Sequence, residues 1–150
     1  MFTYQIIIEY DGTNFVGWQK QKNGSSIQQT IEKSLSKILK EKIILYGSGR
    51  TDAGVHALGQ SGHFYSKSKI DNKFLFLNSI NYFLQKKKIS ILKIIKKKTD
   101  FHARFSAKKR EYKYVIINRT AQLSLEFNRA WHIKSILNFE LIKKAGKLLE

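Results

Sequence analysis

The chain has 150 residues, and 42% of them are hydrophobic, which is enough for a packed core and argues against an intrinsically disordered protein. It contains no cysteine, which excludes disulfides and thiolate metal sites. The sequence shows neither an apolar run of about 18 residues nor the pattern of a secretory leader, so we expect no membrane span and a cytoplasmic location. The net charge of +17, from 28 Lys and Arg against 11 Asp and Glu, favours nucleic acid as a partner, although a biased residue composition would produce the same excess.

Strand and helix patterns alternate in the first part of the chain. Residues 3–10 (TYQIIIEY) are β-branched and aromatic, which predicts a strand, and a loop with several glycines follows. Ser25 or Ser26 is expected to cap a first helix, because apolar residues then recur at helical spacing. The residues of this apolar face are Ile27, Ile31, Leu35, Ile38 and Leu39.

Two further strands, a second helix and a fourth strand come next. Residues 42–46 and 59–66 predict strands on either side of a second glycine-rich loop, and residues 89–96 predict the fourth strand. Asp71 is expected to cap the second helix. Its predicted apolar face holds Phe74, Leu77, Ile80 and Leu84. The order β-α-β-β-α-β is the ferredoxin-like pattern of α+β proteins, with two helices on one face of an antiparallel sheet and the other face open to a partner.

The last third of the chain repeats these signals without completing a second unit. Residues 110–118 (REYKYVIIN) alternate cleanly and predict a fifth strand, and Asn138 is expected to cap a helix that reaches Glu150 with no stop signal. Helices normally end with a cap, so the sequence predicts a truncated protein. We therefore expect residues 1–100 to form one lobe and residues 101–150 to begin a second.

The glycine-rich loop at residues 47–60 (GSGRTDAGVHALGQ) contains a single carboxylate, Asp52. Such an aspartate is most often a turn or cap residue, but the glycines would also let a ligand approach the backbone closely, and Arg50 could keep the carboxylate ionised. The loop matches neither a P-loop nor a dinucleotide fingerprint. His56 and His63 lack the spacing of a metal site, so we expect structural roles for both and chemistry without metal or cofactor.

Three aromatic residues stand near cations in the sequence: Trp18, Tyr112 and Tyr114. An aromatic ring beside a cation suits an unstacked RNA base and its phosphate, whereas strand tyrosines equally often pack in a core. Together with Asp52 and the positive charge, these residues suggest chemistry on a base that has been taken out of its stack.

Three motifs then identify a family. Residues 9–21 (EYDGTNFVGWQKQ), 47–60 and 100–114 (DFHARFSAKKREYKY) resemble, in order and spacing, the N-terminal motifs of the tRNA pseudouridine synthase A family. The resemblance extends over essentially the whole chain. It implies isomerisation of uridine to pseudouridine in the anticodon stem-loop of tRNA, just 3′ of the anticodon, with no cofactor or metal. It also implies a homodimer and a second lobe that forms the opposite wall of the cleft.

The resemblance assigns roles to four residues. Asp52 falls on the essential aspartate of the family's Arg-Thr-Asp-Ala-Gly motif, and Arg50 on the arginine that pairs with it and helps to occupy the space of the flipped base. Tyr112 falls on the tyrosine that stacks on the target uracil, and Arg104 lies in the segment near the RNA path. Whether Asp52 attacks C1′, adds to C6 or deprotonates C2′ stays open. The alternative function is that of a non-catalytic RNA-binding fragment of such an enzyme.

Overall fold

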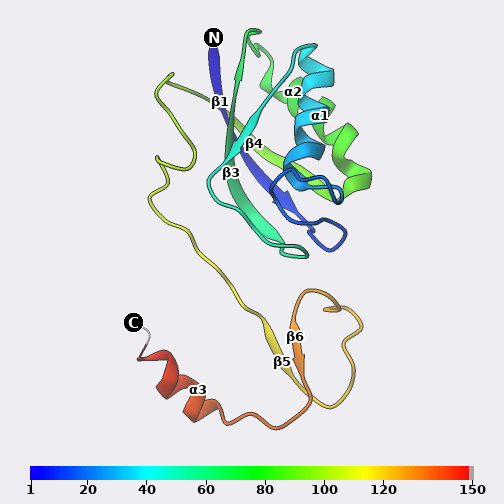
Figure 1. Cartoon of the computed structure of the whole chain (residues 1–150), viewed down its shortest axis with the longest axis vertical. Coiled ribbons are helices and arrows are strands. Elements are labelled where there is room, and N and C mark those ends of the chain that lie inside the picture. Colours follow the sequence, from blue (N-terminus) through cyan, green and yellow to red (C-terminus); the bar gives the residue numbers. More distant parts are fainter. Residues whose placement is uncertain (149–150) are drawn as a thin grey trace. The chain divides into compact units, whose positions relative to one another are not determined.

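The computed structural model describes residues 1–148, and the chain divides into two compact units, Met1–Arg110 and Glu111–Glu150. Figure 1 traces the chain from one unit to the other. Residues 101–110 are part of the first unit. Among the described residues, no helix is both long and apolar enough to cross a membrane.

The first unit is a four-stranded antiparallel sheet with two helices on one face (Figure 1). The sheet order is β2-β3-β1-β4, which is the ferredoxin-like arrangement that the sequence predicts. Its elements are β1 (Phe2–Tyr10), α1 (Ile27–Leu39), β2 (Leu45–Gly47), β3 (Ala57–Ser66), α2 (Lys73–Leu84), the short 3₁₀ helix η1 (Gln85–Lys87) and β4 (Ile89–Lys97).

The central strand β1 supplies one side of the core. Alternate residues point towards the helices and are almost fully buried: Tyr4, Ile6, Ile8 and Tyr10. Helix α1 covers them with Ile27, Ile31 and Leu35, which lie on one face because they are four residues apart. Burial of each such aliphatic side chain contributes about 1.5–3 kcal/mol to stability, so this alternation holds the sheet and helices together.

Helix α1 begins where the sequence predicts. Ser26 is the N-cap, and its side-chain oxygen accepts a hydrogen bond from the Gln29 N–H at 3.2 Å. The helix ends at Leu39, and its C-cap residue, Lys40, adopts the left-handed conformation with φ of 54°.

Helix α2 differs from the prediction at its start and on its buried face. Asn72, not Asp71, is the N-cap and accepts a hydrogen bond from the Leu75 N–H at 3.0 Å. Asp71 instead forms a 2.6 Å ion pair with Lys69. The buried residues are Phe76, Ile80 and Leu84. Phe74 is 71% exposed, because it lies two residues before Phe76 and so about 200° around the helix from it.

The second unit contains β5 (Ile116–Asn118), β6 (Trp131–Ile133) and α3 (Phe139–Gly146). The predicted strand over residues 110–118 is therefore wrong for its first six residues. Only residues 116–118 find a partner strand, β6, which runs parallel to them. The tyrosines before them are exposed, Tyr114 to 90%, so alternation alone does not make a strand where no neighbour supplies the hydrogen bonds.

Helix α3 has the predicted N-cap, Asn138, whose side chain accepts a hydrogen bond from the Leu141 N–H at 3.1 Å. The helix ends at Gly146 rather than continuing as predicted, and residues 149–150 lie outside the described part of the chain. None of the helix residues is buried.

Candidate active site

The loop between β2 and β3 carries Asp52 on a tight turn. The Val55 N–H donates to the Asp52 carbonyl oxygen at 3.3 Å, and Gly54 has a φ of +78°, as the third residue of a type II turn requires. The Asp52 side chain is exposed, and the described residues include no hydrogen-bond or ion-pair partner for its carboxylate. The turn is thus made by the backbone, and the carboxylate is left to face solvent.

A second loop, residues 11–18, lies directly beneath this turn. The Trp18 N–H donates to the Thr51 carbonyl oxygen at 2.9 Å, and the Gly54 N–H donates to the Phe15 carbonyl oxygen at 3.4 Å. Gly17 has a φ of +106°, and a Cβ there would lie 2.7 Å from the Thr51 oxygen. Only glycine fits this approach of the two backbones, which fixes the position of the Asp52 peptide.

Trp18 is part of this support and is not available to a base. Its side chain is 2% exposed, and a Cβ at Gly47 would lie 2.7 Å from the indole ring. The suggestion from sequence that Trp18 stacks on RNA is therefore wrong, because the indole packs against the glycine backbone of β2 and against Tyr10, with ring centroids 6.2 Å apart.

A chain of polar side chains holds the loop from the sheet side. The Tyr10 hydroxyl lies 2.6 Å from Gln60 Oε1 and 2.7 Å from Thr51 Oγ1, and Gln60 Nε2 donates to the Gly49 carbonyl oxygen at 2.8 Å. Burial raises the pKa of the Tyr10 hydroxyl, and its hydrogen bond with Thr51 acts in the opposite direction. Sequence analysis missed both Tyr10 and Gln60.

His56 closes the loop at its other end. Its Nδ1 lies 3.2 Å from Asp11 Oδ1 and 3.2 Å from the Gly12 nitrogen. Asp11 accepts hydrogen bonds from the Thr13 hydroxyl and N–H, and these bonds lower the pKa of Asp11 to about 2, with further help from His56 and Lys88. This histidine thus ties the start of the loop at residues 11–18 to the end of the loop that carries Asp52.

Arg50 and Arg104 are both exposed, and neither is joined to Asp52. The predicted pair between Arg50 and Asp52 is not formed, because among the described residues no ion pair or hydrogen bond links their side chains.

Arg104 ends the segment 101–104, and its carbonyl oxygen accepts a hydrogen bond from Arg110 Nη2 at 3.0 Å. Arg110 also donates to the Ser48 carbonyl oxygen from Nε at 3.1 Å and Nη2 at 2.9 Å. The Arg110 guanidinium therefore connects the Arg104 segment to the start of the loop that carries Asp52.

Tyr112 belongs to the second unit, where its side chain is 66% exposed. An exposed ring has the accessibility that stacking on a base requires, and the alternative, that Tyr112 packs in a core, is not observed.

The face of the sheet opposite the helices is partly covered, where the sequence predicted an open one. His63 on β3 is fully buried there, and its Nδ1 accepts a hydrogen bond from the Ala103 N–H at 3.1 Å. The rings of Tyr46, Phe101 and His102 lie 5.0, 6.0 and 4.5 Å from the His63 ring. Burial lowers the pKa of His63 to about 4, and the neighbouring His102 adds to this effect.

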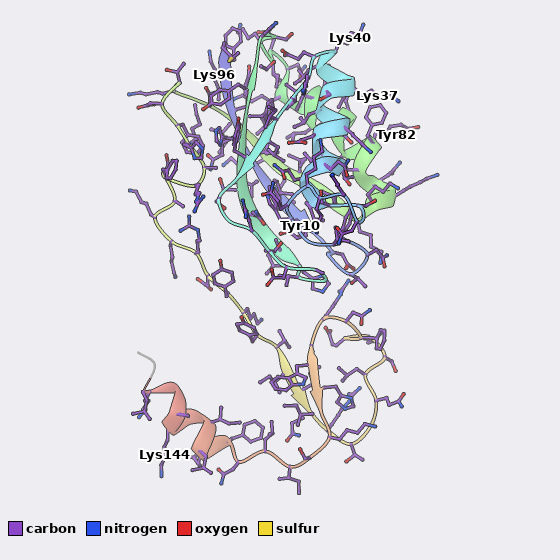
Figure 2. All side chains as sticks on the ribbon, in the orientation of Figure 1. Tyr10, Lys37, Lys40, Tyr82, Lys96 and Lys144 are labelled. Atoms are coloured by element: carbon purple, nitrogen blue, oxygen red, sulfur yellow. The ribbon has the colours of Figure 1, made fainter. Side chains whose placement is uncertain are left out.

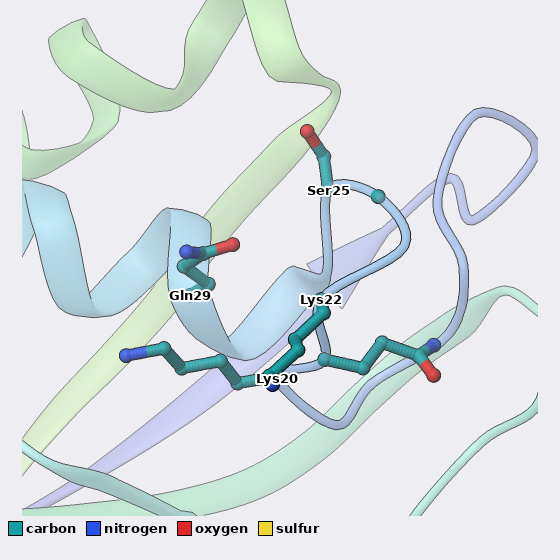
Figure 3. A pocket seen from close by; sticks show the side chains of 6 residues that line it. Lys20, Lys22, Ser25 and Gln29 are labelled. Atoms are coloured by element: carbon teal, nitrogen blue, oxygen red, sulfur yellow. The ribbon is translucent and has the colours of Figure 1, made fainter.

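A shallow hollow of about 650 Å³ lies between the end of the loop that follows β1 and the start of α1 (Figure 3). Its lining residues are Lys20, Gln21, Lys22, Gly24, Ser25 and Gln29. Two lysines beside a helix N-terminus favour an anion. Among the described residues, no group of three or more His, Cys, Asp or Glu side chains could hold a metal ion.

The sequence of this chain is similar to those of known proteins. A family model described as tRNA pseudouridine synthase matches residues 6–106, a range that includes Asp52 and Arg104. The chain is 58% identical over 149 residues to tRNA pseudouridine synthase A of Pelagibacter ubique (strain HTCC1062), covering 99% of this chain and 61% of that protein. It is 50% identical over 143 residues to the protein of the same name from Ehrlichia ruminantium (strain Gardel), covering 95% and 58%. It is 47% identical over 146 residues to the one from Neorickettsia sennetsu (strain ATCC VR-367 / Miyayama), covering 97% and 60%.

The chain thus spans about 60% of the length of the curated relatives that it matches. The family match lies within the first compact unit and includes the whole of the loop that carries Asp52. By this match and by these identities, the chain belongs to the tRNA pseudouridine synthase family.

Proposed function

We propose that this protein isomerises uridine to pseudouridine in the anticodon stem-loop of tRNA, with Asp52 as the catalytic carboxylate. In this reaction the N1–C1′ bond breaks, the uracil turns, and C5 forms the new bond to C1′ while the C5 proton leaves. The observation that carries the proposal is the Asp52 side chain, which is exposed and has no partner among the described residues. The backbone that carries it is fixed by contacts with the loop at residues 11–18. Each of the three roles open to this aspartate needs an accessible carboxylate.

Three other residues would bind the substrate. Tyr112 offers an exposed ring on which the target uracil can stack, and Arg50 lies two residues from Asp52, where a cation can contact the flipped nucleotide. Arg104 and the lysines of the hollow would contact phosphates. We further propose that the protein is cytoplasmic and homodimeric, as the family resemblance implies.

Asp52→Asn tests the catalytic assignment in the complete protein, because it keeps the shape of the side chain and removes its charge. We expect turnover to fall by about 10⁴-fold or more, the size of loss seen when an essential catalytic group is removed. Binding of tRNA should persist. Release of tritium from tRNA labelled at uridine C5 reports the reaction, because the C5 proton is lost when C5 bonds to C1′.

Asp71→Asn is the matched control, because Asp71 is an exposed carboxylate paired with Lys69 and lies outside the loop. It should retain full turnover. Retained turnover in the Asp52 variant would contradict the assignment. Binding of tRNA without any tritium release by the parent protein would instead favour the alternative, an RNA-binding protein without catalysis.

A further inference from the structure

We propose that Tyr10 and Gln60 are positioning residues that hold the backbone on the N-terminal side of Asp52 in its working conformation. The inference rests on the proposed function, in which Asp52 is the catalytic group. It concerns two side chains that lie below the loop and need not touch the RNA.

The hydrogen bonds run in one defined direction. Gln60 Nε2 donates to the Gly49 carbonyl oxygen, so Gln60 Oε1 must face Tyr10, and the single hydroxyl proton of Tyr10 is donated to it. The Tyr10 oxygen can then only accept at its second contact, so the Thr51 hydroxyl donates to it at 2.7 Å. One relay therefore fixes Gly49 and Thr51, which lie three residues and one residue before Asp52, on either side of Arg50.

The relay is anchored on the sheet rather than on another loop. Tyr10 is the last residue of β1 and is 3% exposed, and Gln60 lies in β3 (Figure 2 labels Tyr10). Ile8 faces Gln60 across the ladder, and in an unbroken antiparallel pair Tyr10 would face residue 58. It faces Ala57 instead, because the register shifts between Ile8 and Tyr10. Such irregularities often re-aim a side chain next to an active site, and this one accompanies the approach of the Tyr10 hydroxyl to the loop.

The loop needs an external constraint of this kind. It contains Gly47, Gly49 and Gly54, and glycine has the greatest conformational freedom of any residue in the unbound chain. A carboxylate displaced by about 1 Å can lose about 10²-fold in rate, so groups that restrict the loop act on turnover even at a distance from the base. The relay restricts it from the sheet side, while Gly17 and Trp18 restrict it from below.

Tyr10→Phe tests the proposal in the complete protein, because it removes one oxygen and keeps the ring that packs on Trp18. We expect kcat for tRNA to fall by about 10- to 100-fold, with KM changed much less, because the carboxylate is misplaced while the RNA contacts remain. Thr51→Val should lower kcat by a similar factor. Thr51→Ser keeps the hydroxyl, so its kcat should be close to that of the parent protein. The double variant Tyr10→Phe/Thr51→Val should lose less than the product of the two single losses, since both remove the same relay.

Tyr4→Phe is the matched control. Tyr4 lies on the same strand and the same face, is fully buried, and loses an equivalent hydrogen bond, the one that it accepts from the Ile70 N–H at 2.7 Å. It lies away from the catalytic loop, so its kcat should match that of the parent protein even where its melting temperature is lowered. An equal loss of kcat in Tyr4→Phe, or an unchanged kcat in Tyr10→Phe, would overturn the proposal.

Amide hydrogen exchange separates this proposal from the proposed function. Tyr10→Phe should speed exchange at residues 49–55, whereas Tyr4→Phe should not, whether or not the protein turns over tRNA. The proposed function would be wrong if the parent protein had no turnover or if Asp52→Asn retained it. In either case the exchange result still decides whether the relay positions the loop. Unchanged exchange at these residues in Tyr10→Phe would refute that role.

Discussion

At the scale of single residues, His63 is an ionisable side chain that is fully shielded from water. Its imidazole is buried beneath three other rings, and its Nδ1 accepts the Ala103 N–H, so the neutral form is the one that fits this site. Burial lowers the pKa of His63 to about 4, from an ordinary value of about 6.5. The sequence predicts a structural role for His63, and in the structure this role is to join β3 to the segment 101–104.

This burial predicts a loss of stability in mild acid. The unfolded chain takes up a proton on His63 below about pH 6.5, while the folded chain does so only near pH 4. The contribution of neutral His63 to the free energy of unfolding is therefore fully present above about pH 6.5, and it is lost as the pH falls towards 4. Between pH 7 and 4.5 the contribution is on the order of 2–3 kcal/mol. Urea unfolding at the two pH values should show this difference in the parent protein, and His63→Gln, which does not titrate, should remove it.

His132→Gln is the control for that experiment, because it removes a histidine from the second unit. It should keep the parent's pH dependence. The same dependence in His63→Gln would mean that other groups cause the acid sensitivity.

At the scale of elements, the segment 101–106 is held to the first unit mainly by side chains from other parts of the chain. Arg110 donates three hydrogen bonds, two to the Ser48 carbonyl oxygen and one to that of Arg104. A guanidinium can bridge two carbonyls because its donors are fixed in a plane, whereas an ammonium group cannot reproduce that geometry. The charge at this position matters less than the shape of the donor.

Arg110→Lys should therefore loosen the segment without changing the net charge. We expect amide exchange at Ala103 and Ser106 to rise by roughly tenfold, corresponding to about 1.4 kcal/mol of lost local stability. Arg119→Lys is the matched control, since the Arg119 guanidinium also donates to two carbonyls, those of Ala121 and Gln122, in the second unit. Equal protection of the 101–106 amides in the parent and in Arg110→Lys would show that the ring contacts of His63 hold the segment alone.

At the scale of the whole molecule, the net charge of +17 reflects either a nucleic-acid partner or a biased residue composition. Lysines lie around the first unit, and Figure 2 labels Lys37 on α1, Lys40 at the C-cap of α1 and Lys96 on β4. Only a subset of them can contact phosphates at one time. The salt dependence of binding counts that subset, because each phosphate contact releases counterions.

If this surface binds tRNA, log affinity should fall linearly with log salt, with a slope of about −0.7 to −0.9 for each phosphate contacted. Lys20→Gln/Lys22→Gln, which removes both lysines of the hollow, should make the slope less steep by about 1.5. Fluorescence anisotropy with labelled tRNA at several salt concentrations measures both quantities.

Lys37→Gln/Lys40→Gln is the control, with the same change in charge at the far end of α1, about 12 and about 16 Å along the helix axis from Gln29. It should leave the slope close to that of the parent. A flat response of the parent protein would mean that its charge reflects composition and not an RNA-binding face.

Local patterns in the sequence were sufficient for the order of the four strands and two α-helices of the first unit and for the position of the glycine-rich loop that carries Asp52. Alternation in β1, the spacing of apolar residues in α1 and the cap at Ser26 depend on residues a few positions apart, and all three are observed. The glycine loop around Asp52 was recognisable for the same reason, since its motif is continuous.

Contacts between distant residues could be decided only by the tertiary structure. Tyr10 is 50 residues from Gln60, His63 is 40 from Ala103, and Arg110 is 62 from Ser48. No periodicity in the sequence encodes such pairs, because they form only when the sheet order brings β1, β3 and the segment after β4 together. The same reason explains the burial of Trp18 and the lack of a strand at residues 110–115: a side chain or strand edge is assigned by what packs against it, and those neighbours come from elsewhere in the chain.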